Sequence, residues 1–215
     1  MYAQWKVKSA YAQMSQVAAS MSGYEAARRV LDAGGLQNVE IEQVPGHLSD
    51  HYDPRSKVLR LSPEVYRGNS MASVGIAAHE AGHALQDAKN YAPLVIRNLA
   101  VPAANFGSSI GTILLMVGMV MVISMGASVL GKWIFLAGIV AFGATVAFQL
   151  INLPVEFDAS ARAKTQLVNL GIVSGADLHY VSKVLNAAAL TYVAATQAVL
   201  TLLYYVMRYM QATRD

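Results

Sequence analysis

The chain has 215 residues, of which 55% are hydrophobic and only 13% are charged, and its mean hydropathy is +0.38. Soluble domains are nearer a quarter charged, so this composition is typical of a membrane protein. The net charge of +3 is small, and the basic residues form no dense patch interleaved with aromatic side chains, which argues against a nucleic-acid partner. The chain contains no cysteine, so any zinc site must use histidine, glutamate or aspartate.

The first 97 residues carry ten of the sixteen lysines and arginines and predict a small polar domain. Residues 3–20 are compatible with a mildly amphipathic helix. Ser22 and Glu25 have the spacing of a capping box, and the glycine pair 34–35 predicts the end of that helix.

Two strands are predicted after this helix, because apolar and polar residues alternate over 38–44 and 57–62. The segment 45–56 between them is rich in Pro, Gly, Asp and Ser and predicts a loop or a hairpin turn. A further helix is predicted from about residue 71 to about residue 89.

Three long uncharged stretches follow, at 98–131, 133–155 and 184–207. About 20 apolar residues cross a bilayer core, so we predict three transmembrane helices, at about 104–127, 132–153 and 184–207. The first two form a hairpin around Lys132, which places residues 1–97 and 154–183 on the same face of the membrane. The predicted fold class is therefore a mostly α-helical integral membrane protein, divided into parts at 1–97, 98–153, 154–183 and 184–215.

The stretch HEAGH at 79–83 contains residues that could bind zinc and act as a general base. On a helix, His79 and His83 lie on one face, one turn apart, and can bind the same zinc ion. Glu80 can then reach a water at the metal without binding the metal, and can act as a general base. Ala81 and Gly82 are small, which suits a helix packed closely beneath a metal or a substrate. His47 and His51 are also four residues apart, but the prolines and glycine around them exclude a helix there, so we interpret them as loop residues.

A catalytic zinc ion needs a third protein ligand and an open position. Membrane topology restricts this ligand to residues 1–97 or 154–183. Glu156 is our prediction, because a carboxylate at a membrane boundary is costly unless it is paired or binds metal. We expect a new helix to begin at Pro154, and we predict that Asp158 holds a histidine N–H in place.

Other candidates are less constrained. His179 is a competing ligand or a donor to the transition state, and Tyr192 and Arg97 are further possible donors. Each also has an ordinary explanation as a surface or interhelical residue. The predicted strands 38–44 and 57–62 could supply a sheet edge for the backbone of a substrate, or they could only cap the zinc helix and bury its apolar side.

The motifs HEAGHALQ, NLPVEFDAS, KVLNAAALTYVAA and DHYDPRSKVLRLSPEVY, together with the hydrophobic hairpin, resemble those of the YugP-type membrane zinc metallopeptidases, also called neutral zinc metallopeptidases. The similarity spans nearly the whole chain. It implies a zincin-like N-terminal domain with Zn²⁺ bound by His79, His83 and Glu156, and with Glu80 as the catalytic base. Members of this family usually begin with a further apolar segment, which the opening sequence MYAQWK does not contain.

A more distant similarity is to the gluzincin membrane proteases of the CAAX-prenyl-protease and heat-shock-protease kind. Their third ligand begins an E-x-x-x-D motif. This chain has Ser160 at the aspartate position, and Asp158 is the nearby acid.

These features predict a membrane-embedded zinc endopeptidase that cleaves polypeptide, including unfolded or membrane proteins. The alternatives are a zinc-stabilised membrane scaffold or quality-control adaptor, and a zinc hydrolase acting on a non-peptide amide. Thirteen of the sixteen basic residues lie on the predicted active-site side. The positive-inside rule therefore places the site on the cytoplasmic face of the bacterial inner membrane.

Overall fold

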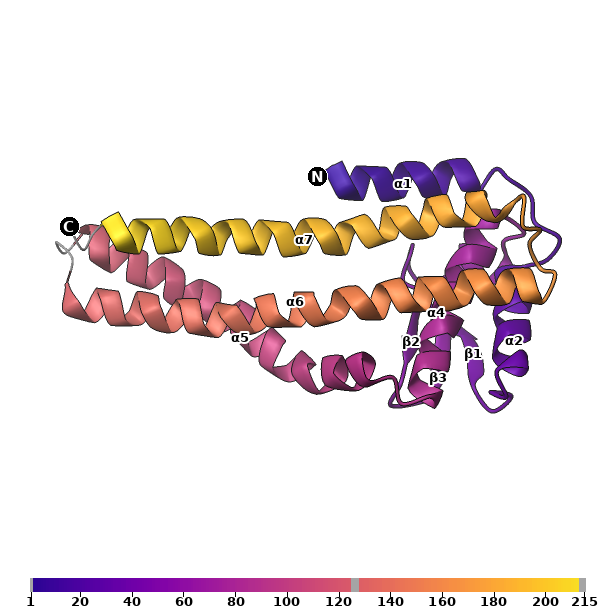
Figure 1. Cartoon of the computed structure of the whole chain (residues 1–215), viewed down its shortest axis with the longest axis horizontal. Helices are drawn as coiled ribbons and strands as arrows, with labels where there is room; N and C mark the ends of the chain where they lie inside the picture. The colour runs from indigo at the N-terminus through magenta and orange to yellow at the C-terminus, as the bar shows by residue number, and fades with distance from the viewer. Residues whose placement is uncertain (1, 125–127, 213–215) are drawn as a thin grey trace. The chain divides into compact units, whose positions relative to one another are not determined.

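The computed structural model describes residues 2–124 and 128–212. The chain is mostly helical and forms two compact units (Figure 1). The first comprises Met1–Leu94 and Pro154–Thr191, and the second comprises Val95–Leu153 and Tyr192–Asp215. The candidate site lies within the first unit.

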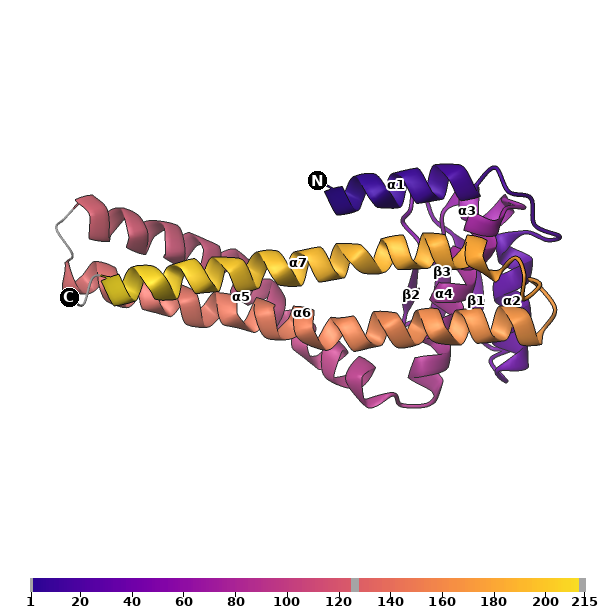
Figure 2. The same ribbon diagram turned by 45° about the horizontal axis from the view of Figure 1, so that its top comes forward.

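The N-terminal helices of the first unit are α1 (Tyr2–Met14) and α2 (Gly23–Ala33). The predicted capping box of α2 is confirmed. The Ser22 side chain accepts from the Glu25 backbone N–H at 3.2 Å, and the Ser22 backbone N–H donates to the Glu25 carboxylate at 2.8 Å. Helix α1 lies beside the first turns of α7 (Leu178–Ala212) in both views (Figures 1 and 2), where Lys183 donates to Gln13 at 2.6 Å.

A three-stranded sheet follows, made of β1 (Glu40–Gln43), β2 (His51–Asp53) and β3 (Val58–Leu61) in the order β1-β3-β2. Strand β1 is parallel to β3, and β2 is antiparallel to it. The two predicted strands are confirmed as β1 and β3. The prediction of a loop or turn over 45–56 missed β2, because three residues are too few for an alternating pattern and the strand depends on pairing with β3.

Two helices complete the N-terminal part of the first unit. The short α3 (Pro63–Arg67) precedes α4 (Met71–Ala88), which is the predicted helix that carries HEAGH. The side chain of Ser70 caps α4 by accepting from the backbone N–H of Ser73.

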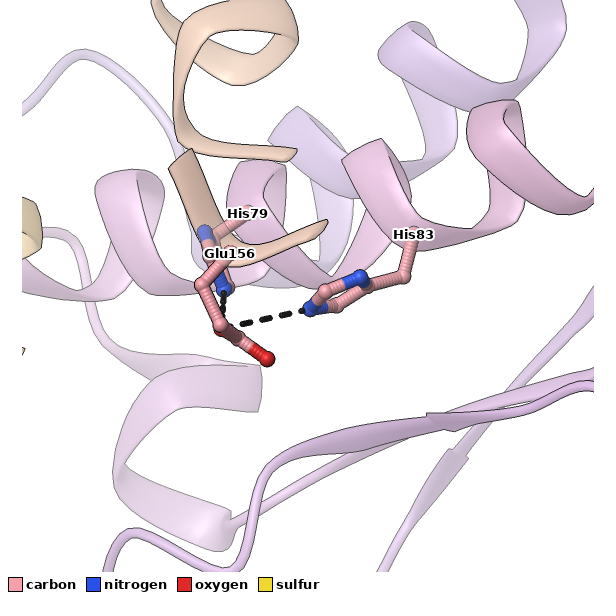
Figure 3. A group of neighbouring side chains, drawn as sticks. All are labelled: His79, His83 and Glu156. Atoms are coloured by element: carbon pink, nitrogen blue, oxygen red, sulfur yellow. Dashed lines mark hydrogen bonds and ion pairs between the residues drawn. The ribbon is translucent and has the colours of Figure 1, made fainter. Parts of the chain in front are cut away.

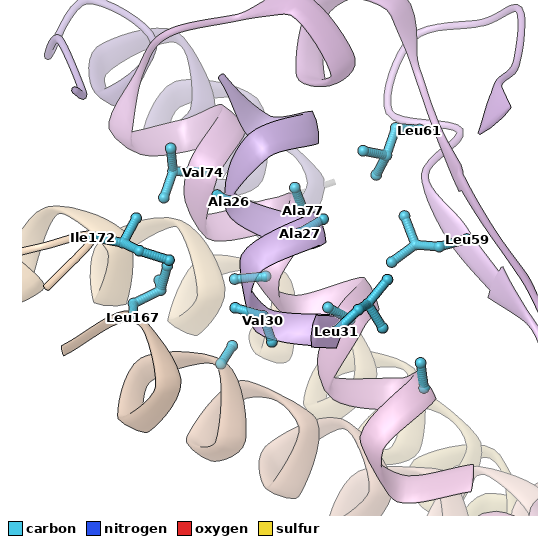
Figure 4. Packing of buried hydrophobic residues seen from close by; sticks show 14 of the residues in the cluster. Ala26, Ala27, Val30, Leu31, Leu59, Leu61, Val74, Ala77, Leu167 and Ile172 are labelled. Atoms are coloured by element: carbon cyan, nitrogen blue, oxygen red, sulfur yellow. The ribbon is translucent and has the colours of Figure 1, made fainter. Parts of the chain in front are cut away.

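The hydrophobic core of the first unit joins α2, α4, the sheet and the C-terminal part of α6 (Val129–Asn169) (Figure 4). Leu31, Leu59, Val74 and Leu167 are among its fully buried side chains. Because Leu167 belongs to α6, this core holds the segment after the hydrophobic hairpin against the N-terminal helices. A core of this kind positions α6 residues relative to α4.

The second unit contains α5 (Ala92–Ser124), the first part of α6 and the last part of α7. Glycines allow α5 and α6 to approach closely: a Cβ atom at Gly138 would lie 2.6 Å from the backbone nitrogen of Leu115, and one at Gly111 would lie 2.8 Å from that of Phe142. Small residues at such crossings are typical of helices that pack in a bilayer.

Among the described residues, helices α5 and α6 are long and apolar enough to cross a membrane, which agrees with the first two predicted spans. The third, at 184–207, falls within α7 and stays a prediction. Helix α6 continues through Pro154 to Asn169, so the expectation of a new helix beginning at Pro154 is wrong. Proline removes one hydrogen bond, and membrane helices tolerate that loss.

Core packing by α6 predicts a clear stability difference between two neighbouring residues. Replacing the fully buried Leu167 with alanine should cost about 2–5 kcal/mol of unfolding free energy, because it leaves a cavity. Val168→Ala is the matched control, since Val168 is 37% exposed and should change stability by less than about 0.5 kcal/mol. Thermal unfolding of the detergent-solubilised chain, followed by circular dichroism, measures both. Equal midpoints for the two variants would contradict this account of the core.

Candidate metal centre

Two histidine side chains of α4 project from successive turns toward the same point (Figure 3). The ring centroids of His79 and His83 are 4.8 Å apart and their planes cross at 83°. Their side chains are only 13% and 10% exposed. The four-residue spacing therefore presents both imidazoles to one buried location, as a helix requires.

Glu156 reaches the same point from α6 (Figure 3). Its Oε2 atom lies 3.2 Å from Nε2 of His79 and 3.7 Å from Nε2 of His83. The Glu156 side chain is 8% exposed. A carboxylate so poorly solvated needs cationic partners or a metal ion to offset the cost of its charge.

These three side chains fit a zinc ion. Nitrogen and oxygen ligands of a tetrahedral zinc are bound at about 2.0–2.2 Å and so lie about 3.3–3.6 Å from each other. The two measured separations fall close to that range, and all three ligand atoms lie within 4.8 Å of one another. Among the described residues, no other group of His, Cys, Asp and Glu side chains could hold a metal ion.

The Nδ1 atoms of both histidines, which face away from Glu156, each have a hydrogen-bond partner. The Ser160 hydroxyl lies 3.1 Å from Nδ1 of His79, and Oε1 of Gln86 lies 3.0 Å from Nδ1 of His83. Sequence reasoning assigned no role to Gln86 or Ser160. Their positions in the sequence could have indicated a role. Gln86 is one helical turn after His83, and Ser160 occupies the aspartate position of the E-x-x-x-D motif of the more distant membrane proteases.

Asp158 is linked to the histidine cluster through the side chain of Gln86. It accepts hydrogen bonds from Gln86 at 2.8 Å and from Arg162 at 2.5 Å. The guanidinium of Arg162 in turn stacks on the ring of Tyr91, 5.6 Å from its centroid. The contact that we predicted between Asp158 and a histidine is therefore indirect in the structure, because Gln86 lies between them.

Glu80 lies next to the metal cluster in the sequence and faces strand β2. The backbone of Tyr52 on β2 lies close enough to its side chain to favour the charged form of the carboxyl group. Burial raises the pKa of Glu80 to about 7; His79 opposes this rise, and the neighbouring carboxylates of Glu156 and Asp50 add to it. A carboxyl group with such a pKa can exchange a proton near neutral pH.

The sheet presents β1 and β2 as its edges, and β3 lies between them. The expectation that residues 57–62 could supply an edge is therefore wrong. Of the two edges, β2 is the one that reaches Glu80, through Tyr52.

The remaining histidines have other partners. His179 is exposed, and its Nδ1 lies 2.7 Å from the carbonyl oxygen of Ala176. His47 pairs with Glu64 at 2.7 Å. His51 is on no helix, as predicted, but the interpretation of it as a loop residue is wrong, because it lies on strand β2. Tyr192 and Arg97 both belong to the second unit, and their suggested roles stay predictions.

Comparison with known proteins identifies the family. The model of the family described as "Putative neutral zinc metallopeptidase" matches residues 1–210. This chain belongs to that family. The resemblance stated from the sequence motifs is therefore confirmed, and Zn²⁺ is the cofactor that the family implies.

A relative in Bacillus subtilis (strain 168) is named "Putative membrane protease YugP". It is 46% identical to the chain over 196 residues, which cover 90% of the chain and 84% of the relative. No solved structure matches the chain significantly. Family membership indicates a zinc-dependent peptidase that acts on polypeptide, and the two apolar helices agree with a membrane-associated protein.

The cluster depends on a close approach of α4 and α6, which yields a prediction. A Cβ atom at Gly82 would lie 2.6 Å from the backbone carbonyl oxygen of Ala159, so Gly82→Ala must push the two helices apart. We expect at least about a tenfold loss of zinc affinity, because the ligands would no longer converge. Competition with a fluorescent zinc chelator in detergent measures this loss. Gly175→Ala, where an added Cβ atom meets nothing within 4 Å, is the control, and unchanged affinity in the Gly82 variant would refute the prediction.

Proposed function

We propose that the chain is a membrane-embedded zinc-dependent endopeptidase, in which a glutamate acts as general base. The observation that carries this proposal is the convergence of His79, His83 and Glu156, with Glu80 on the adjoining position of α4. Membership of a zinc metallopeptidase family supports it.

The proposed ligands are His79 and His83 from α4 and Glu156 from α6. When bound, zinc supplies a Lewis acid for the scissile carbonyl and for the attacking water. The burial of all three side chains supports this assignment, since it favours the strong, short-range electrostatics that a metal centre needs.

Glu80 is the proposed general base. It accepts a proton from the attacking water, whose oxygen adds to the carbonyl carbon, and it returns that proton to the nitrogen of the leaving amine as the C–N bond breaks. Burial raises the pKa of this carboxyl group, which makes it a better proton acceptor than an exposed glutamate. The backbone of Tyr52 lies near this carboxyl group, which places the proposed base beside strand β2.

Strand β2 is the proposed docking edge for substrate. An extended polypeptide that adds to a sheet edge gains main-chain hydrogen bonds without requiring a particular sequence. The contact between Glu80 and Tyr52 favours β2 over β1, because it puts the base at that edge. The proposed substrates are accordingly unfolded or membrane-anchored polypeptides, cleaved at the cytoplasmic face of the bacterial inner membrane.

A zinc-stabilised scaffold is the main alternative, and the number of proposed protein ligands argues against it. Structural zinc sites are closed by four protein ligands, whereas catalytic sites keep one position open. Within the described residues the group comprises three side chains, and His179 is not among them. A hydrolase for a non-peptide amide would use the same residues, so the choice of substrate in the assay separates it from a peptidase.

The deciding experiment compares wild type with Glu80→Gln, using the purified chain in detergent, a fluorescently labelled unfolded protein and a parallel zinc analysis. We expect wild type to cleave, and the variant to keep one zinc ion per chain while losing at least about a hundredfold in rate, because general-base catalysis contributes about that much. A variant that cleaves as fast as wild type would exclude Glu80 as the base. If wild type binds zinc and cleaves no polypeptide, the scaffold or the non-peptide amidase becomes the better reading.

Replacing Glu156 with glutamine tests the ligand assignment separately. The amide keeps the size of the side chain and removes the negative charge that a zinc ligand supplies, so we expect zinc content to fall well below one ion per chain. Metal analysis after dialysis against a chelator gives the result. A Glu156→Gln chain that retains full zinc would remove Glu156 from the ligand set.

A further inference from the structure

The amide of Gln86 lies between His83 and helix α6. The residue is fully buried, at 0% exposure. Its Oε1 atom lies 3.0 Å from Nδ1 of His83, and its Nε2 atom donates to the carbonyl oxygen of Val155 and to Oδ2 of Asp158, both at 2.8 Å. The side chain thus connects a proposed zinc ligand with the helix that carries Glu156.

The surroundings allow only one orientation of this amide. The backbone carbonyl of Val155 can only accept a hydrogen bond, so the NH₂ group of Gln86 must face it and the neighbouring Oδ2 atom of Asp158. Arg162 donates to the same Asp158 oxygen at 2.5 Å, so this oxygen accepts from two donors. The reversed amide would set its oxygen against two other oxygens in a fully buried position, at the full cost of unsatisfied polar groups.

The orientation of the amide determines the proton position on His83. With the NH₂ group committed to Val155 and Asp158, Oε1 of Gln86 can only accept, so Nδ1 of His83 must carry the hydrogen. In the neutral ring Nε2 then has the lone pair, and it lies on the side of Glu156, 3.7 Å away. A metal ligand needs this arrangement, with one ring nitrogen held by a hydrogen bond and the other free to bind.

His79 lacks an equivalent constraint. Its Nδ1 partner is the Ser160 hydroxyl, which can donate or accept by rotating. Ser160 therefore accommodates either form of the His79 ring, whereas Gln86 selects one form of the His83 ring. The hydrogen bonds therefore restrict the tautomer of His83 and leave that of His79 unrestricted.

We propose that Gln86 is a positioning residue that fixes the ring orientation and tautomer of His83 for zinc binding, with its own amide fixed by Val155 and Asp158. This inference rests on the proposed function, since it takes His83 as a zinc ligand. It assigns a role to the last residue of HEAGHALQ, and it explains why Asp158 acts on the centre without contacting a histidine.

The first test is zinc affinity of the full chain in detergent, measured by competition with a fluorescent chelator. Gln86→Met keeps the length of the side chain and removes all three hydrogen bonds, so we expect about a 10–100-fold loss of affinity. Ser160→Ala should lose less than Gln86→Met, because the serine does not select one form of its histidine. Gln166→Met makes the same substitution at a partly buried glutamine of α6, is the matched control and should bind like wild type.

The second test separates orientation from packing by reversing the polarity of one hydrogen bond. Gln86→Glu still offers His83 an acceptor but places a carboxylate oxygen against the carbonyl of Val155 and against Asp158, so zinc should bind more weakly. Adding Asp158→Asn supplies an N–H donor opposite the new carboxylate and leaves the amide oxygen to accept from Arg162, while the repulsion from Val155 stays. The double variant should therefore recover part of the loss, about fivefold or more in affinity over Gln86→Glu alone. Both substitutions preserve side-chain size, so a role in packing alone predicts no recovery.

The outcomes separate this inference from the proposed function. If His83→Ala and Glu156→Gln leave zinc affinity unchanged, the metal centre itself is wrong. If these two variants lose zinc while Gln86→Met binds like wild type, only the role of Gln86 is overturned. If circular dichroism shows that Gln86→Met does not fold, the size-preserving pair decides, and an absence of recovery in the double variant rejects the role.

Discussion

The close approach of α4 and α6 is the constraint on which the metal centre depends. At Gly82 the backbone of α6 comes so near that a single Cβ atom would collide with the carbonyl of Ala159. That proximity brings Glu156, three residues before Ala159, to the ring nitrogens of His79 and His83. The sequence reasoning expected small residues here beneath a metal or a substrate, but in the structure the space beside Gly82 is taken by a helix.

The buried surroundings of the site then determine how each polar group can bond. Gln86 has no contact with solvent, so its donors and acceptor must be satisfied by the groups around it. Because every polar atom of Gln86 must be satisfied, its amide has one orientation, and that orientation places a hydrogen on Nδ1 of His83. Interatomic distances alone do not locate such hydrogens. The same amide also connects Asp158, Arg162 and Tyr91 to the proposed ligand His83 through one continuous set of contacts.

Much of the local structure could be predicted because it depends on neighbours in the sequence. The capping box of α2, the HEAGH helix and the strands β1 and β3 each have a pattern of a few residues that specifies them. Strand β2 and the continuation of α6 through Pro154 could not be predicted in this way. The strand exists through pairing with β3, and the helix continues past a proline whose local preference is to end it.

The sequence by itself determined the side chains that define the candidate site: two imidazoles one helical turn apart and a glutamate beside the first. It also determined the long uncharged segments that are typical of a membrane-associated protein. It also singled out Glu156, because a carboxylate after an apolar helix requires a partner. Only the tertiary structure decided which side chains support the cluster, since Ser160 and Gln86 acquire their partners from segments about 70 to 80 residues away in the chain. Helix periodicity specifies which side chains share a face. The contacts between two helices depend on packing across the core, which no local pattern encodes.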